Sequence, residues 1–426
     1  MIGQKEYKKR RDKLAKSLSE NSVGILFSAS YRPRSNDTEY PYRQNSNFYY
    51  LTSFKEDNSC LVIVKTTKGV KTILFVQAKD KQKELWNGKR LGEKEAEKIF
   101  LVDEVYAITN LEEKLKKFLQ TSKNLYFDFG LEYSKMKVLK RYAKGIAVHQ
   151  NIAPLVNEMR LIKSVAEIAL IKKAINITKK AHHKAMSFSK ANKNEYELQA
   201  EIEHVFKSNG AYSDAYTSIV ACGNSANTLH YIENNKPLQD NELILIDAGC
   251  EYEYYASDIT RCIPVNGKFT EVQKELYNMV LDVELKIIEM IKPNMLRNDL
   301  QKKSEELLCQ GMVKLGILKG NYKKLIKKQE HKKFYPHGIG HWMGIDVHDE
   351  CPYKYDNGDE IPLRKGMVLT IEPAIYIDKD DKSVPKKYRG IGIRIEDDIL
   401  VTKEGYVNLS YEIAKSIEEI ESLSLS

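Results

Sequence analysis

Residues 243–261 read LILIDAGCEYEYYASDITR, and this stretch decides the fold of the C-terminal part of the chain. The apolar run Leu243–Ile246 predicts a buried strand that ends in Asp247, and Ser257–Val265 predicts a second strand that carries Asp258. The two aspartates are 11 residues apart, which suits two strands joined by a hairpin with the carboxylates side by side. Like carboxylates held close together repel, and a divalent cation relieves that repulsion.

A second pair of acids lies in later strand-like segments. Met367–Ile371 is an apolar run that ends in Glu372, and Gly390–Val401 alternates apolar residues with others around Glu396. This alternation has the period of two that is typical of a strand. A carboxylate beside a buried strand is costly unless something neutralises it. We therefore expect Glu372 and Glu396 to form a second carboxylate pair, joined by a longer connection.

Three of the nine histidines of the chain lie within twelve residues, between the two acid pairs. The segment reads HGIGHWMGIDVH and contains His337, His341 and His348, with glycines that allow close approach of the backbone to a ligand. Four carboxylates and one imidazole favour Mn²⁺, Mg²⁺ or Co²⁺ over a thiolate zinc site. Because carboxylates can bridge, five side chains suffice for two ions about 3.5–4 Å apart, an arrangement that supports amide hydrolysis.

The patterns along the chain predict two domains, with bounds 1–155 and 160–426. Strand-like runs that alternate with helical patterns indicate an α/β N-terminal domain, and helices with an antiparallel sheet indicate an α+β C-terminal domain. Ser164 and Glu167 have the pattern of a capping box at the start of a helix that runs to about Phe188. The other strand-like runs cover 23–27, 60–64 and 72–76, and the other helical patterns cover 111–119, 195–207, 271–291 and 299–315.

The segments around these acids and histidines together resemble the aminopeptidase P family of the creatinase, or pita-bread, metallopeptidases. In the N-terminal part, one segment resembles the domain shared by aminopeptidase P and prolidases, and another resembles bacterial aminopeptidase P. The resemblance implies an α/β N-terminal domain and a pita-bread catalytic domain with a curved antiparallel sheet. The segments that carry it are 42–51, 86–92, 227–231, 246–249, 257–261, 337–349, 370–374 and 392–398.

By this resemblance, five side chains hold two divalent metal ions, for which we expect Mn²⁺. Asp258 and Glu396 are expected to bridge both ions, with Asp247 on one ion and His341 and Glu372 on the other. The implied reaction removes the first residue from peptides whose second residue is proline, through attack of a metal-bridging hydroxide on the Xaa-Pro bond. Glu372 is expected to accept the proton of the attacking water.

The resemblance also implies substrate contacts and an oligomer. We expect His230 or His348 to stabilise the oxyanion or to assist the departing nitrogen, and Arg394 to act in the same site. Trp86 is expected to reach the active site of a neighbouring subunit, which favours a homo-oligomer such as a dimer or tetramer. The expected substrate-binding residues are His230, His337, His348, Tyr376, Arg394 and Trp86.

Several alternatives stay open at this point. A prolidase would use the same metal set on Xaa-Pro dipeptides, although the segment around Trp86 favours the aminopeptidase. A non-catalytic binding homologue is expected to have lost metal ligands, whereas all five types are present in this chain. Methionine aminopeptidases do not need an N-terminal domain of this size, and creatine amidinohydrolases lack the acidic metal set.

Composition limits the partners and the location. Hydrophobic residues make up 42% and charged residues 30%, as in ordinary globular proteins. No run approaches the roughly 18 apolar residues of a membrane helix, and the lysine-rich N-terminus lacks an apolar stretch, so we expect a cytoplasmic protein without a membrane partner. The net charge of +9 comes with no nucleic-acid-binding motif, so we expect no nucleic acid. Six cysteines without CxxC spacing predict free thiols in packed positions.

Overall fold

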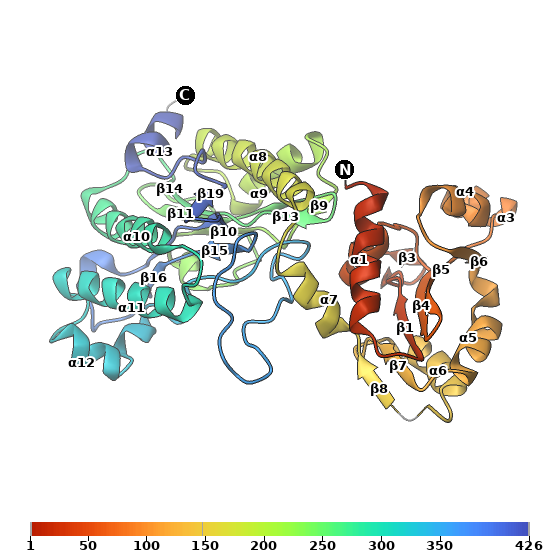
Figure 1. Cartoon of the computed structure of the whole chain (residues 1–426). Coiled ribbons are helices and arrows are strands. Elements are labelled where there is room, and N and C mark those ends of the chain that lie inside the picture. Colours follow the sequence, from red (N-terminus) through yellow and green to blue (C-terminus); the bar gives the residue numbers. More distant parts are fainter. Residues whose placement is uncertain (1, 147, 425–426) are drawn as a thin grey trace. The chain divides into compact units, whose positions relative to one another are not determined.

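A six-stranded sheet forms the centre of the first of two units, Met1–Arg160, in the computed structural model of the chain (Figure 1). The structure describes residues 2–146 and 148–424. The strands of this sheet are β1 (Ser22–Phe27), β4 (Cys60–Thr66), β5 (Gly69–Val76), β6 (Glu104–Ala107), β7 (Asn124–Phe127) and β8 (Val148–Asn151). Their order is β6-β5-β4-β1-β7-β8, with antiparallel pairs at β5/β4 and β4/β1 and parallel pairs elsewhere. This mixed sheet contains the three strands predicted for the N-terminal part.

Helices complete the α/β architecture of the first unit. Leu111, Leu115 and Leu119 recur at intervals of four on one face of α5 and are buried in the core. A short hairpin, β2 (Pro33–Ser35) with β3 (Thr38–Glu39), lies outside the main sheet. The helices are α1 (Gln4–Ser17), α2 (Ser46–Thr52), α3 (Lys81–Asn87), α4 (Gly92–Ile99), α5 (Leu111–Gln120), α6 (Tyr133–Tyr142) and α7 (Ala153–Arg160).

The second unit, Leu161–Ser426, begins with the helix that the capping box predicts. Its helices are α8 (Val165–Phe188), α9 (Glu195–Ser208), α10 (Glu271–Met290), α11 (Arg297–Lys314), α12 (Tyr322–Lys327) and α13 (Ile417–Ser424). The Ser164 hydroxyl accepts a hydrogen bond from the Glu167 amide, and the Glu167 carboxylate accepts one from the Ser164 amide. Helices α8 and α9 lie side by side, as do α10 and α11 (Figure 1).

The strands around Asp247 and Asp258 form an antiparallel hairpin with an interruption. They are β10 (Ile219–Cys222), β11 (Leu243–Asp247), β12 (Cys250–Tyr252), β13 (Tyr255–Ala256) and β14 (Thr260–Pro264), with β9 (Ser213–Asp214) beside β12. The pairs β11/β14 and β12/β13 keep one register, and the Ala248 amide donates to the Ile259 carbonyl at the interruption. The predicted hairpin is therefore confirmed.

The interruption shortens the second predicted strand. In the shared register Gly249 stands opposite Asp258, and a side-chain carbon at Gly249 would lie 1.9 Å from the carbonyl oxygen of Ser257. Glycine is therefore the residue that permits this close backbone approach. The prediction of one strand over Ser257–Val265 is wrong at its start, because the regular pairing of β14 begins only at Thr260.

The second acid pair lies at an equivalent interruption. Its strands are β15 (Val368–Ile371), β16 (Ala374–Ile377), β17 (Ile391–Arg394), β18 (Asp397–Val401) and β19 (Tyr406–Asn408). The pairs β15/β18 and β16/β17 again keep one register, so Glu372 stands opposite Glu396 between them. The prediction of a single strand over Gly390–Val401 is wrong, because this segment contributes to two different sheets.

The break in that strand has a local cause. Pro373 has no amide hydrogen, so it cannot donate to the strand opposite it. The Ile395 amide still reaches the Pro373 carbonyl at 3.3 Å, but the Glu396 amide donates to the Thr260 carbonyl of the first hairpin at 3.1 Å. This last bond joins the two hairpins where their acids lie, and it brings the four carboxylates together.

The histidine-rich segment runs along β15. Within the described residues, no helix or strand lies between the short helix Glu330–Lys333 and β15. The Thr370 amide donates to the His341 carbonyl at 3.0 Å, and the Glu372 amide donates to the Ile339 carbonyl at 2.8 Å. A side-chain carbon at Gly340 would lie 1.9 Å from the Thr370 carbonyl oxygen. The glycine thus lets His341 approach the strand that precedes Glu372.

Two further predictions concern the chain as a whole. All six cysteines occupy buried positions, as predicted. Among the described residues, no helix combines the length and the apolar character that crossing a membrane requires.

Candidate metal centre and active site

One cavity of about 430 Å³ in the second unit brings together ten of the eleven predicted site residues. Trp86 is the exception, because it lies on α3 of the first unit, where it is 82% exposed. Its role at a neighbouring subunit stays a prediction. The ten residues that line the cavity are His230, Asp247, Asp258, His337, His341, His348, Glu372, Tyr376, Arg394 and Glu396.

The five predicted metal ligands converge in this cavity. Asp247, Asp258 and Glu396 each offer a ligand atom within 4.8 Å of the others, and so do His341, Glu372 and Glu396. Glu396 belongs to both groups, which is the position that a bridging carboxylate needs. The ligands come from the two hairpin interruptions and from the glycine-containing segment beside β15, so their approach depends on the packing of all three.

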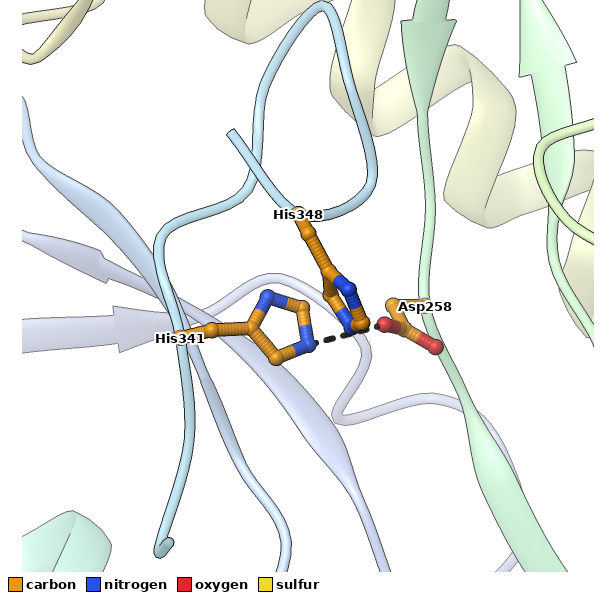
Figure 2. A group of neighbouring side chains, drawn as sticks. All are labelled: Asp258, His341 and His348. Atoms are coloured by element: carbon orange, nitrogen blue, oxygen red, sulfur yellow. Dashed lines mark ion pairs between the residues drawn. The ribbon is translucent and has the colours of Figure 1, made fainter. Parts of the chain in front are cut away.

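The imidazole of His341 is oriented as a metal ligand requires. Its Nδ1 lies 3.0 Å from the Trp342 carbonyl oxygen, which can only accept, so Nδ1 carries the hydrogen. This leaves Nε2 facing the acids, 3.2 Å from Asp258 Oδ2 (Figure 2). It also lies 3.8 Å from Glu372 Oε1. Burial is the largest single influence and opposes protonation, but the hydrogen bond and the charge of Asp258 together with the charge of Glu372 raise the pKa of His341 to about 9. Nε2 therefore binds a proton or a metal ion in its place.

The carboxylates also call for a cation between them. Asp247 Oδ1 is buried and has no hydrogen-bond partner within residues 2–146 and 148–424. Burial, together with the charges of Asp258 and Glu372, raises the pKa of Glu396 well above its ordinary value. Buried like charges at this distance are unfavourable unless a positive ion compensates them. The oxygen-rich donor set, the orphaned oxygen and the oriented imidazole fit divalent metal ions.

A chain of hydrogen bonds fixes the wall of the cavity beside Asp247. Arg394 donates from Nη2 to Asp247 Oδ2 at 2.6 Å and from Nη1 to the Tyr376 hydroxyl at 2.7 Å. His337 Nδ1 donates to the Gly338 carbonyl at 2.8 Å, and burial lowers the pKa of His337 to about 4. Its Nε2 is therefore an acceptor, and the Tyr376 hydroxyl donates to it at 2.9 Å. Both the tautomer of His337 and the direction of the Tyr376 hydroxyl follow from this chain.

His230 and His348 differ from the other histidines because they face solvent at the cavity. The ring of His348 lies edge-on to that of His341, with centroids 4.2 Å apart (Figure 2). His348 also has a ring nitrogen within 4.8 Å of ligand atoms of Asp258 and His341. Both exposed histidines are placed where a substrate would meet the metal ligands.

Three residues near the metal ligands were missed by the sequence reasoning. Thr260 donates to Glu396 Oε2 at 2.7 Å and accepts from Arg394 Nε at 3.1 Å, so it links a ligand to the arginine. The Tyr216 hydroxyl is buried, and its pKa is raised by burial and by nearby carboxylates such as Asp247. Tyr353 lines the cavity. Thr260 could have been found from its place two residues after Asp258, whereas nothing in the sequence marks the tyrosines.

Comparison with known proteins assigns this arrangement to a family. Residues 169–403 match metallopeptidase family M24, and residues 7–126 match the aminopeptidase P N-terminal domain. The chain belongs to metallopeptidase family M24. It is 41% identical over 425 residues to a Xaa-Pro aminopeptidase of Haemophilus influenzae, covering 99% of this chain and 97% of that relative. It is 40% identical over 440 residues to the Xaa-Pro aminopeptidase of Escherichia coli, covering 100% and 98%.

A solved structure supports the same assignment for this M24 chain. Zinc-substituted E. coli aminopeptidase P in complex with product matches it with a TM-score of 0.95 at 39% identity, covering 100% of this chain and 98% of the other. These findings confirm the predicted family and the predicted fold, an aminopeptidase P-type N-terminal domain followed by a pita-bread metallopeptidase domain.

Proposed function

We propose that this chain is a metal-dependent Xaa-Pro aminopeptidase, which removes the N-terminal residue from peptides with proline at the second position. The observation that carries the proposal is the convergence of five metal-ligating side chains and five further polar side chains on one cavity. Relatives named Xaa-Pro aminopeptidase, which match this chain over almost its whole length, support the choice of substrate.

We further propose that the cavity holds two divalent ions, with Mn²⁺ as the expected metal. Asp247, Asp258, His341, Glu372 and Glu396 would hold the two ions, and Glu396 belongs to both groups of candidate ligands. When bound, the ions supply Lewis-acid activation of a water molecule and of the scissile carbonyl. Oxygen-rich donors favour Mn²⁺ over softer ions, which supports this choice.

The protein side chains supply orientation and proton transfer. Arg394 holds the Asp247 carboxylate and the Tyr376 hydroxyl in fixed positions. We assign to Glu372 the acceptance of a proton from the attacking water, since it lies among the ligands in the cavity. His230 or His348 donates to the developing oxyanion or to the departing proline nitrogen, because both histidines face the open side of the cavity.

The test compares Ala-Pro-Ala, Ala-Ala-Ala and the dipeptide Ala-Pro with and without Mn²⁺, and again after chelation. We expect release of alanine from Ala-Pro-Ala, no cleavage of Ala-Ala-Ala, and recovery of activity when Mn²⁺ is restored. Glu372→Gln is expected to lower kcat by about 10²-fold or more, as loss of a general base does. Glu404→Gln is the matched control, because Glu404 is an exposed acid outside the cavity.

Other results would point elsewhere. Cleavage of the dipeptide Ala-Pro with Ala-Pro-Ala left intact would make the chain a prolidase. Failure to cleave any peptide with any divalent metal would refute the catalytic assignment and indicate a binding homologue.

The assembly and the location remain predictions of the sequence, namely a homo-oligomer in the cytoplasm. Sedimentation velocity measures the assembly directly. If Trp86 reaches the active site of a neighbouring subunit, Trp86→Ala will raise KM for Ala-Pro-Ala and leave the Mn²⁺ affinity unchanged. An unaltered KM would remove Trp86 from the substrate-binding set.

A further inference from the structure

A cation that the proposed mechanism does not use contacts two residues of the cavity wall. Arg297, the first residue of α11, donates from Nη1 to the Gly340 carbonyl at 3.2 Å. Its guanidinium carbon also lies 4.7 Å from the centre of the Tyr353 ring, a cation–π distance. Gly340 and Tyr353 both line the cavity, so Arg297 is held by two parts of its wall.

The guanidinium is the outermost member of a stack. Trp342 lies against Tyr353 with ring centroids 5.4 Å apart and planes 16° apart, and Trp342 is only 1% exposed. Arg297, on the same tyrosine, is partly exposed. A side-chain carbon at Gly338, which is exposed and lines the cavity, would lie 3.8 Å from Arg297 Nη1. The charge therefore lies at the partly exposed end of a stack whose other end, Trp342, is buried.

Arg297 has hydrogen-bonding capacity left over. Its Nε is buried and has no partner among the described residues, and Nη2 makes no hydrogen bond to any of them. An arginine at the first position of a helix is also disfavoured by the helix dipole, whose positive end lies there. An anion bound at Nη2 would compensate this unfavourable placement, while Nε stays enclosed.

We propose that Arg297 is a specificity-determining residue that binds the C-terminal carboxylate of short peptide substrates, so that free-acid Xaa-Pro-Yaa tripeptides are the preferred class. This inference rests on the proposed function. Gly340, whose carbonyl Arg297 holds, directly precedes the metal ligand His341. One extended residue spans at most about 3.6 Å, so the carboxylate of a third residue lies about 7 Å beyond the scissile bond. Guanidinium groups bind carboxylates strongly and with defined geometry.

The test compares Ala-Pro-Ala with the same peptide carrying a C-terminal amide. For the unaltered protein with Mn²⁺, we expect kcat/KM for the free acid to exceed that for the amide by about tenfold or more, as expected for one charge-assisted hydrogen-bonded pair. Arg297→Gln should abolish this preference by raising KM for the free acid, while KM for the amide stays unchanged. Arg297→Lys should retain part of the preference, because lysine keeps the positive charge but cannot form the two parallel hydrogen bonds of a guanidinium.

Lys302→Gln is the matched control, since Lys302 is an exposed cation on the same helix and does not line the cavity. It should keep the full preference for the free acid. Equal loss of activity on both substrates in Arg297→Gln would assign Arg297 a purely structural role and overturn the proposal. Equal cleavage of both substrates by the unaltered protein would overturn it too, while the proposed aminopeptidase function would stand. Cleavage of neither substrate would refute both.

Discussion

Substitution of Gly340 by alanine tests whether the metal centre depends on the close approach of two backbone segments. The new Cβ would lie 1.9 Å from the Thr370 carbonyl oxygen and 2.7 Å from its carbonyl carbon. Real Cβ atoms stay at least 3.0 Å from such neighbours, so one segment must move by about 1 Å. His341 follows Gly340 directly, and Glu372 follows Thr370 by two residues, so this movement separates two of the proposed metal ligands.

The size of the effect follows from that displacement. Overpacking of a well-packed interior costs about 1–3 kcal/mol. With an unfolding entropy of about 2.1 cal/mol/K per residue, 1 kcal/mol corresponds to a change in Tm of about 1–2 °C in a protein of this size, so we expect Tm to fall by about 1–5 °C. A misplacement of about 1 Å at a catalytic site can lower the rate by about 10²-fold, which corresponds to about 2.7 kcal/mol in the activation free energy. We therefore expect a large loss of kcat and weaker Mn²⁺ binding together with a moderate loss of stability.

Calorimetric titration with Mn²⁺, thermal unfolding and kcat for Ala-Pro-Ala measure these three effects. Gly338→Ala is the control, because a Cβ there meets nothing closer than 3.8 Å. It should keep the Tm and the Mn²⁺ affinity of the unaltered protein. Normal Mn²⁺ affinity and kcat in Gly340→Ala, or equal losses of Tm and Mn²⁺ affinity in both variants, would refute the reasoning.

Three further predictions concern charges and metal. Lys163→Met removes an ion pair with Asp349 in which each side chain is 1% exposed, so urea unfolding should show a loss of about 3–5 kcal/mol in the free energy of unfolding. Lys286→Met, at an exposed ion pair, is the control and should lose less than about 1 kcal/mol. Burial raises the pKa of Glu284 from 4.5 to about 8, so the protonated side chain contributes fully to stability below pH 4.5 and this contribution is lost as the pH rises to about 8. The Tm of Glu284→Gln should therefore depend less on pH across this range. An equal pH dependence of Tm in both proteins would contradict the raised pKa. Chelation should lower Tm reversibly, because a metal ion at about 100 times its Kd stabilises the folded state by about 2.7 kcal/mol. A Tm that changes neither on chelation nor on addition of Mn²⁺ would contradict metal binding at this site.

Much of this architecture could be predicted because it depends on local patterns. The capping box of Ser164 and Glu167 and the apolar run before Asp247 are features of a few neighbouring residues, and the structure contains them as predicted. The hairpin between Asp247 and Asp258 also followed from spacing alone. The continuous alternation across Gly390–Val401 was misleading because periodicity within one segment carries no information about Pro373, which lies between β15 and β16 and interrupts the hydrogen bonding to that segment.

The site shows where local patterns stop being informative. Arg394 donates to Asp247 across 147 positions of sequence, and Thr260 donates to Glu396 across 136. No spacing rule relates residues that far apart, because their distance depends on how the two hairpins pack. The hydroxyl of Tyr216 lies by the metal ligands for the same reason, and its sequence neighbours carry no sign of it.

The sequence by itself determined which residues are candidates for the proposed chemistry, because acids beside buried strands require compensation that a metal ion can supply. Only the tertiary structure decided how these residues face one another. It placed Glu372 opposite Glu396, set the tautomers of His337 and His341 through carbonyl acceptors, and brought Arg297 to the Gly340 carbonyl. These relations arise from hydrogen bonds and close backbone contacts between distant segments, and such contacts form only when the hairpins, helices and connecting segments pack together.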